Sequence, residues 1–278
     1  MINTLVSLNA DLASSIAFRY SCRLTQLIDM HVQTIHVEEP EKEGYPPGSG
    51  WVRSTWEKGL LRTAREEISQ LINADSVSSP KLGNTIVRIG DREEELLREI
   101  QTDAYDLLVE GVLNSYDAQL FFQKVRSKLY KYARCPIILV KNLVSPERVA
   151  LLVGDPQEAK AMAATVAKLF SRARVSIDLV GFAVQKSGQT ALKQKVTEVA
   201  PQGLETVAEI VNTTATQLVE QGLTLNEKWI IRDNPKKTGE TLGEYGLVAA
   251  SISGNAAKKN QLMDLLSRVP TATLLCKQ

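Results

Sequence analysis

Apolar runs of strand length alternate along the whole chain with segments in which apolar residues recur at helical spacing. Runs such as MHVQTIHV and PIILV are short and rich in β-branched residues, which is typical of buried strands. Between such runs, Leu12, Ile16 and Tyr20 recur at every fourth position and form one face of a helix. This alternation predicts an α/β fold in which helices cover a parallel sheet.

The same plan is present twice. We expect five strands in each half: residues 4–8, 30–37, 84–90, 105–111 and 136–140, then residues 148–153, 175–184, 225–232, 245–251 and 272–276. The segments YDLLVEGVLNS and YGLVAASISGN share a register, and each precedes a helix and a last strand that ends at a lysine, Lys141 or Lys277. An internal duplication of about 140 residues explains this pattern. We therefore predict two tandem five-stranded α/β domains, at residues 1–143 and 147–278.

The charge and the cysteines of the chain restrict its partners. With 33 basic and 32 acidic residues the net charge is +1, so no broad attraction to nucleic acid or to an anionic membrane is expected. Three widely spaced cysteines, Cys22, Cys135 and Cys276, indicate free thiols in a reducing compartment, and with only two histidines a zinc site is disfavoured. The first residues, MINTLVSLNADLAS, lack the basic start and the long apolar core of a signal peptide, and no later run reaches roughly 18 apolar residues. We expect a cytoplasmic protein.

Three segments of the first half carry a family resemblance: TLVSLNADLASSIAFRYSCRL at the start, VRIGDREEELLREIQTDAYDLLVEG, and KLYKYARCPIILV before the joint. They resemble the universal stress protein family, and the second half is similar mainly in layout, through LLVGDPQEAKAM and EYGLVAAS. The resemblance implies five-stranded parallel domains that pair through their last strands, so two fused copies would form an internal pseudo-dimer. The apolar strand PIILV would then pair with ATLLC, because an uncovered apolar edge strand promotes aggregation. Protein partners or a homodimer are further expectations.

The nucleotide-binding branch of this family carries Gly-x-x-Gly, nine further residues, and then Gly followed by Ser or Thr. Here Gly111 matches the first glycine, Asn114 replaces the second, and Lys124 stands in place of the third. In the second half the same register begins at Ser251 and ends at Asp264, whose negative charge would repel a phosphate. We therefore expect that the ATP phosphate loop is missing.

The adenine end of such a site is open to two interpretations. The family places an aspartate that contacts adenine just after the first strand, where this chain has Asn9, with Asp11 two residues on, and Asp155 in the second half. Asp155 is also spaced from Glu158 as a helix cap. His36 resembles a histidine common in the second strand of the family, and its alternative is a structural role.

A long insertion rich in proline and glycine is expected at residues 38–59. Trp51 and Trp56 would stack on a base with Arg53 near a phosphate, or else would pin the loop to the domain surface.

No Gly-x-Ser-x-Gly, Walker loop or metal-ligand cluster occurs, so we expect no enzymatic activity. The leading hypothesis is a non-enzymatic tandem universal stress protein that lacks the ATP loop, with no certain cofactor, and acts through protein partners. The alternative is a sensor that binds AMP, ADP or ATP through the first-half residues Asn9, Asp11, Gly111, Asn114 and Ser115. A third hypothesis is an enzyme of the related adenine-nucleotide hydrolase class.

Overall fold

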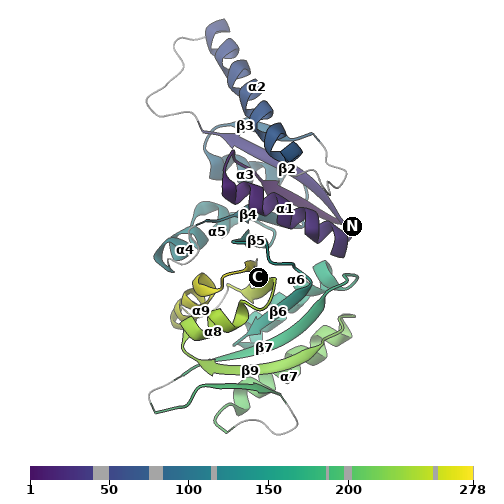
Figure 1. The fold of residues 1–278 in the computed structure, drawn as a ribbon, viewed down its shortest axis with the longest axis vertical. Coiled ribbons are helices and arrows are strands. Elements are labelled where there is room, and N and C mark those ends of the chain that lie inside the picture. The colour runs from purple at the N-terminus through teal and green to yellow at the C-terminus, as the bar shows by residue number, and fades with distance from the viewer. Residues whose placement is uncertain are drawn as a thin grey trace.

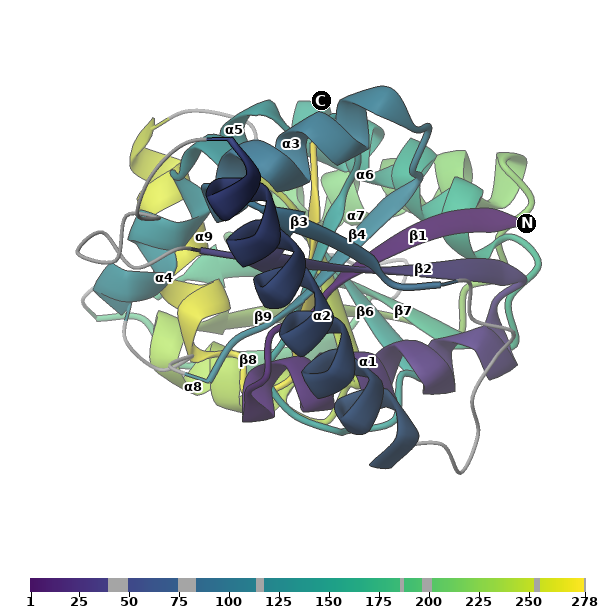
Figure 2. The same cartoon turned by 90° about the horizontal axis from the view of Figure 1, so that it is seen from above.

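A computed structural model describes residues 1–39, 50–74, 84–113, 118–185, 188–196, 202–252 and 256–277 of the chain. These residues form one eleven-stranded sheet with helices on both of its faces (Figure 1, Figure 2). The sheet is parallel within each half of the chain, apart from one edge strand. The predicted α/β class with a mostly parallel sheet is therefore confirmed.

All ten predicted strands are present. The first half contains β1 (Ile2–Ser7), β2 (Met30–Glu38), β3 (Ile86–Ile89), β4 (Leu107–Gly111) and β5 (Ile137–Val140), in the order β3-β2-β1-β4-β5. The second half contains β6 (Arg148–Val153), β7 (Ser176–Val184), β9 (Glu227–Asp233), β10 (Leu247–Ser251) and β11 (Ala272–Cys276), in the corresponding order β9-β7-β6-β10-β11. The edge strand β8 (Leu192–Lys195) was not predicted, because the sequence LKQK has one apolar residue and no strand-like alternation.

The two halves meet where β5 pairs with β11 in antiparallel orientation, with Ile138 opposite Leu274. The predicted contact between PIILV and ATLLC is therefore confirmed, and neither apolar strand forms a free edge. The result is one continuous sheet, so the prediction of two domains paired as a pseudo-dimer is not confirmed.

The apolar core is also shared between the halves. One buried cluster contains Val6 and Ile138 together with Leu274, and the cluster on the opposite face contains Leu5 and Leu139 with Leu275 among its members. Successive strand residues point to opposite faces, so neighbouring residues of β1, β5 and β11 enter different clusters. Each face of the sheet thus has a core that runs through the junction.

The helices divide between these two clusters. On one face lie α1 (Leu12–Leu27), α2 (Trp51–Ala74), α6 (Pro156–Phe170) and α7 (Glu205–Glu220). On the other lie α3 (Arg92–Thr102), α4 (Ala118–Val125), α5 (Lys128–Tyr132), α8 (Pro235–Leu242) and α9 (Ala256–Arg268). Helix α2 extends past the sheet at the top of Figure 1.

Two helices begin at a residue whose side chain caps them. Asp91 accepts a hydrogen bond from the Glu94 backbone N–H at 3.0 Å, and Asn234 caps α8 in the same way, with proline as the next residue. Helix α6 begins directly after Asp155, where the sequence indicated a cap, and the Asp155 carbonyl accepts a hydrogen bond from the Ala159 N–H at 3.0 Å. The side chain of Glu158 lies outside the described residues.

The predicted loop at residues 38–59 is wrong at both of its ends. Glu38 is the last residue of β2, and residues 51–59 form the first turns of α2, while residues 40–49 lie outside the described part of the chain. Gly59 apart, the prolines and glycines of this segment stop before Trp51, so its proline-rich first part misled the prediction for the residues that follow. Trp51 is 79% exposed, so it does not pin a loop to the surface, whereas Trp56 is partly buried.

Candidate functional site

The predicted first-half site lies at the carboxyl ends of β1, β2 and β4. These strands are adjacent and parallel, so their carboxyl ends share one edge of the sheet. In open α/β sheets this edge is where ligands bind. Asn114 and Ser115, which were predicted to contribute to this site, lie outside the described residues.

Asn9 and Asp11 follow β1, but they have different environments. The Asp11 carboxylate caps α1 by accepting a hydrogen bond from the Ser14 backbone N–H at 2.7 Å. The Asn9 backbone N–H donates to the Ser14 hydroxyl at 2.7 Å. Among the described residues, the Asn9 side-chain amide has no hydrogen-bond partner. Of these two side chains, Asn9 therefore remains available to a ligand.

His36 is buried and connects the ends of β1 and β2. Its Nδ1 lies 2.9 Å from the Leu8 carbonyl oxygen, and its Nε2 lies 3.0 Å from the Glu38 carboxylate. Both ring nitrogens thus face oxygen atoms of the protein, and a ring N–H donates to one of them. This geometry matches the structural alternative for His36, because neither nitrogen is left for a ligand.

Gly111 is required by packing at the end of β4. A Cβ at this position would lie 1.9 Å from the Ala13 carbonyl oxygen, because the start of α1 passes directly over the strand. Its φ is not positive, so no other backbone demand applies. Only glycine leaves room for this contact, and that explains its presence without a phosphate.

A buried carboxylate that the sequence analysis missed precedes this glycine in the chain. Glu110 is fully buried, and its Oε1 is 2.5 Å from the Arg92 guanidinium at the start of α3. Its Oε2 accepts from the Tyr130 hydroxyl at 2.5 Å and lies 3.7 Å from the Lys124 ammonium. Arg92 also donates to the Ser7 hydroxyl at 2.8 Å. We call these five residues the Glu110 cluster.

The charges within the Glu110 cluster stabilise one another. Burial by itself raises the pKa of Glu110, but the charges of Arg92 and Lys124 and the hydrogen bond from Tyr130 hold the pKa at about 2. The pKa of Tyr130 is raised, mainly by burial and next by the negative charge of Glu110. Glu110 is therefore ionised at neutral pH, and it neutralises cations that lie near Gly111. A single acid in an otherwise apolar strand, LLVEG, was the available signal in the sequence.

No protein-family model matches this sequence, and no curated protein matches it. Solved structures do. A universal stress protein from Archaeoglobus fulgidus has a TM-score of 0.58 and 13% identity, covering 99% of this chain and 96% of that chain. This chain has the universal stress protein fold. A proposed universal stress protein from Pseudomonas aeruginosa UCBPP-PA14 has a TM-score of 0.56 and 13% identity, over 99% of this chain and 92% of its own.

A functionally unknown protein from Pseudomonas aeruginosa PAO1 shares the universal stress protein fold of this chain. Its TM-score is 0.57 at 14% identity, and the match covers 99% of this chain and 92% of that chain. The resemblance read from the sequence is thus confirmed for the fold over nearly the whole chain, including the half in which the sequence was similar mainly in layout.

At the carboxyl edge of the second half of this universal stress protein fold, the described residues line a small cavity. The cavity has a volume of about 140 Å³ and lies at the ends of β6 and β7. It is lined by Leu152, Val153, Gly154, Phe182, Val184, Gln261 and Leu262. None of these described lining residues is charged, and a cavity of this size does not accommodate a nucleotide.

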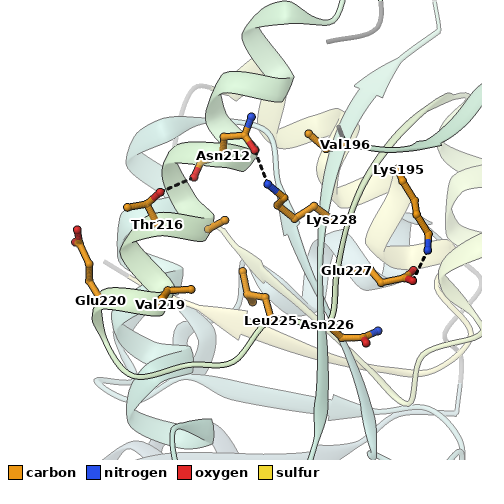
Figure 3. Close-up of a pocket in the computed structure, with 11 residues that line it drawn as sticks. Lys195, Val196, Asn212, Thr216, Val219, Glu220, Leu225, Asn226, Glu227 and Lys228 are labelled. Carbon is orange, nitrogen blue, oxygen red and sulfur yellow. Dashed lines mark hydrogen bonds and ion pairs between the residues drawn. The ribbon is translucent and has the colours of Figure 1, made fainter. Parts of the chain in front are cut away.

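A larger cavity, of about 690 Å³, lies at the opposite end of β9 (Figure 3). In the view of Figure 3, Lys228 points to Asn212 on α7 and Lys195 points to Glu227. The lysines therefore already have partners. Because this cavity lies at the amino end of β9, it is separate from the edge at which the family resemblance places a nucleotide.

Two lysines connect the halves reciprocally at the β5–β11 junction. Lys141 follows β5 and donates to the Leu266 and Val269 carbonyls, at 2.7 and 2.8 Å, at the end of α9. Lys277 follows β11 and donates to the Ala133 carbonyl at 3.1 Å, just after α5. Each lysine thus satisfies carbonyls at the carboxyl end of a helix from the other half.

The buried Lys141 is expected to make stability depend on pH. Burial lowers the pKa of Lys141 to about 7, against 10.5 when it is exposed. The unfolded chain then binds more protons than the folded chain between these values, so the free energy of unfolding rises with pH. We expect a rise of about 2 kcal/mol from pH 6.5 to pH 8.5 that is absent from Lys141→Met. Urea unfolding at both pH values measures it, and equal slopes in the two proteins would contradict the assignment.

Among the described residues, no helix combines the length and the hydropathy needed to cross a membrane. Within the same residues, no three His, Cys, Asp or Glu side chains gather as metal ligands would.

Proposed function

We propose that this protein is a tandem universal stress protein that lacks the ATP phosphate loop and acts without catalysis, by associating with protein partners in a stress response. The similarity of fold over the whole chain supports the family. The Glu110 cluster supports the absence of a phosphate site, and it is the observation on which the proposal rests.

A nucleotide phosphate needs cations or backbone N–H groups that are not already used by the protein. The cations Arg92 and Lys124, which lie near Gly111, share the buried Glu110 carboxylate. The Arg92 backbone N–H also donates to the Glu39 carboxylate at 3.2 Å, which adds a second negative charge at this edge. A phosphate would therefore have to compete with carboxylates that are fixed in place, and the cavity that the described residues line at the carboxyl edge of the second half is small and uncharged.

The proposal includes two universal stress protein units, residues 1–143 and 147–278, paired inside one chain. The identical strand order of the halves and the reciprocal lysines support this organisation. A self-complementary contact of this kind is the arrangement expected of a symmetric dimer. Because the pairing already covers β5 and β11, partners would bind other surfaces.

Calorimetric titration of the nucleotide-stripped protein with ATP and AMP, at physiological salt, tests the proposal. We expect no dissociation constant below about 1 mM, which corresponds to a binding free energy of about 4 kcal/mol. We also expect no turnover of ATP. Micromolar ATP affinity would contradict the loss of the phosphate site. Turnover of ATP that is lost in an Asp155→Asn variant would instead favour the third hypothesis, an enzyme of the adenine-nucleotide hydrolase class.

An adenine-nucleotide sensor is the second candidate, and the Asn9 amide favours it. This amide is unbonded among the described residues at the ligand edge, and an amide matches the donor and acceptor pattern of an adenine. The sensor hypothesis predicts that the protein binds AMP and that Asn9→Ala lowers the affinity for AMP about tenfold or more. Asn212→Ala, on distant α7, is expected to leave the affinity for AMP unchanged. AMP binding that is equal in all three proteins would exclude Asn9 from the site.

A further inference from the structure

The two halves correspond residue by residue at the starts of their central strands. In the first half, the Asp106 backbone N–H donates to the Asn3 carbonyl at 2.7 Å. In the second half, the Gly246 N–H donates to the Arg148 carbonyl at 2.9 Å. Asp106 therefore corresponds to Gly246, and Asn3 corresponds to Arg148.

The offset in residue number between Asn3 and Arg148 also applies to the helix that follows each strand. It matches Tyr20 on α1 with Thr165 on α6. Burial supports this alignment, because residues 17–18 and residues 162–163 are buried while the residue after each pair is exposed. The helices therefore present equivalent positions to the junction, but one has a phenol ring where the other has a threonine.

Tyr20 fills its side of the junction completely. Its side chain is fully buried, and its hydroxyl donates to the Gly246 carbonyl, in the other half, at 3.0 Å. This contact satisfies the one polar atom of an otherwise apolar ring.

On the opposite side, Thr165 is too small to fill the corresponding space, and a cavity of about 260 Å³ is found there. It is lined by Tyr105, Asp106, Arg134, Cys135, Thr165 and Lys168, with neighbouring residues of α6 and of the segment before β5. The Lys168 ammonium binds the Asp106 carboxylate at 2.6 Å across it. The cavity thus occurs where the pairing of Asp106 with Gly246 places the counterpart of the Tyr20 ring.

We propose that this cavity is a binding site for a small phenol, whose ring takes the place that Tyr20 takes on the other side. The Asp106 carbonyl corresponds to the Gly246 carbonyl and is the expected acceptor for the phenol hydroxyl. The volume is below that of sites for drug-sized ligands and suits a molecule with a single ring.

A bound phenol would contact both halves at once. Asp106, Arg134 and Cys135 come from the first half, whereas Thr165 and Lys168 come from the second. Binding would therefore stabilise the junction, because a ligand that binds only the folded protein raises the free energy of unfolding.

Amide chemical shifts of the full-length, isotope-labelled protein titrated with p-cresol test this site. We expect saturable shifts at Asp106, Cys135 and Thr165, and about fivefold weaker binding of toluene, which lacks the hydroxyl donor. Shifts that do not saturate, or that centre elsewhere, would overturn the proposal.

The Thr165→Tyr variant fills the cavity from within and is expected to lower p-cresol affinity at least tenfold. Val219→Tyr adds the same residue at an exposed position of α7 and is expected to leave binding unchanged. Unaltered binding in Thr165→Tyr would also overturn the proposal. If Thr165→Tyr does not fold, Thr165→Phe blocks the same space, and the shift map of the unmodified protein decides the location of the site on its own.

Discussion

Replacement of Glu110 by alanine is expected to lower the free energy of unfolding by about 3 to 5 kcal/mol. The change leaves the Arg92 guanidinium and the Tyr130 hydroxyl without the carboxylate that they contact at 2.5 Å in a fully buried position. An unpaired buried charge costs far more than the loss of one exposed contact, so the effect is larger than for a surface ion pair. Equilibrium unfolding in urea at pH 7 measures it.

Glu94→Ala is the matched control for this prediction. Glu94 forms an ion pair with Lys128 at 3.2 Å, but its side chain is 58% exposed, so a loss below about 1 kcal/mol is expected. The pH dependence of the free energy of unfolding gives a second test of the Glu110 cluster. The pKa of Glu110 is held at about 2, below its ordinary 4.5, so its contribution to stability is complete above pH 4.5 and is lost as the pH falls toward 2. A similar loss in both variants at pH 7 would contradict the role of the Glu110 cluster.

Gly111→Ala is expected to destabilise the protein by about 3 kcal/mol. The added methyl group would lie 1.9 Å from the Ala13 carbonyl oxygen and 2.3 Å from its carbonyl carbon. Both are backbone atoms at the start of α1, so no side-chain rotation relieves the overlap, and the helix itself must move away from β4. Thermal and urea unfolding measure the change.

The control for this variant is Gly59→Ala in α2. A Cβ there meets no atom within 4 Å, and alanine favours a helix, so a gain of about 0.5 to 1 kcal/mol is expected. Unchanged stability of Gly111→Ala would show that the contact with Ala13 can relax. If the variant is destabilised as expected, a loss of nucleotide binding in it would not identify Gly111 as a phosphate contact, and Asn9→Ala becomes the better test of the site.

The candidate site was predictable in location but not in its chemistry. Gly111 was recognised as the end of a strand at the ligand edge, yet its contact with Ala13 joins residues that are far apart in the chain. Glu110 was visible as an acid among apolar residues, but nothing local identifies Arg92, Lys124 and Tyr130 as its partners. These three side chains come from three different helices, so only the packing of those helices on one face of the sheet brings them together.

The fold itself was largely determined by local sequence. Strand and helix periods, and the capping residues Asp91 and Asn234, depend on neighbouring residues alone, and they gave elements that the structure contains. The local signals were wrong at Trp51, where proline and glycine upstream hid the start of a helix, and they missed β8, whose residues are mostly polar. The meeting of β5 with β11 was also expected, because the family resemblance implies pairing through the last strands and PIILV would otherwise be an uncovered apolar edge.

The tertiary structure decided everything that depends on contacts between distant residues. The sequence alone determined ten strands, their order along the chain and the likeness of its two halves. Only the folded chain shows that a core runs through the junction on each face of the sheet, that Lys141 and Lys277 bind helix ends in the opposite half, and that Tyr20 and Thr165 differ in how they fill the junction. The physical reason is that periodicity and capping are properties of neighbouring residues, whereas burial, charge pairing and cavities depend on which distant surfaces come into contact.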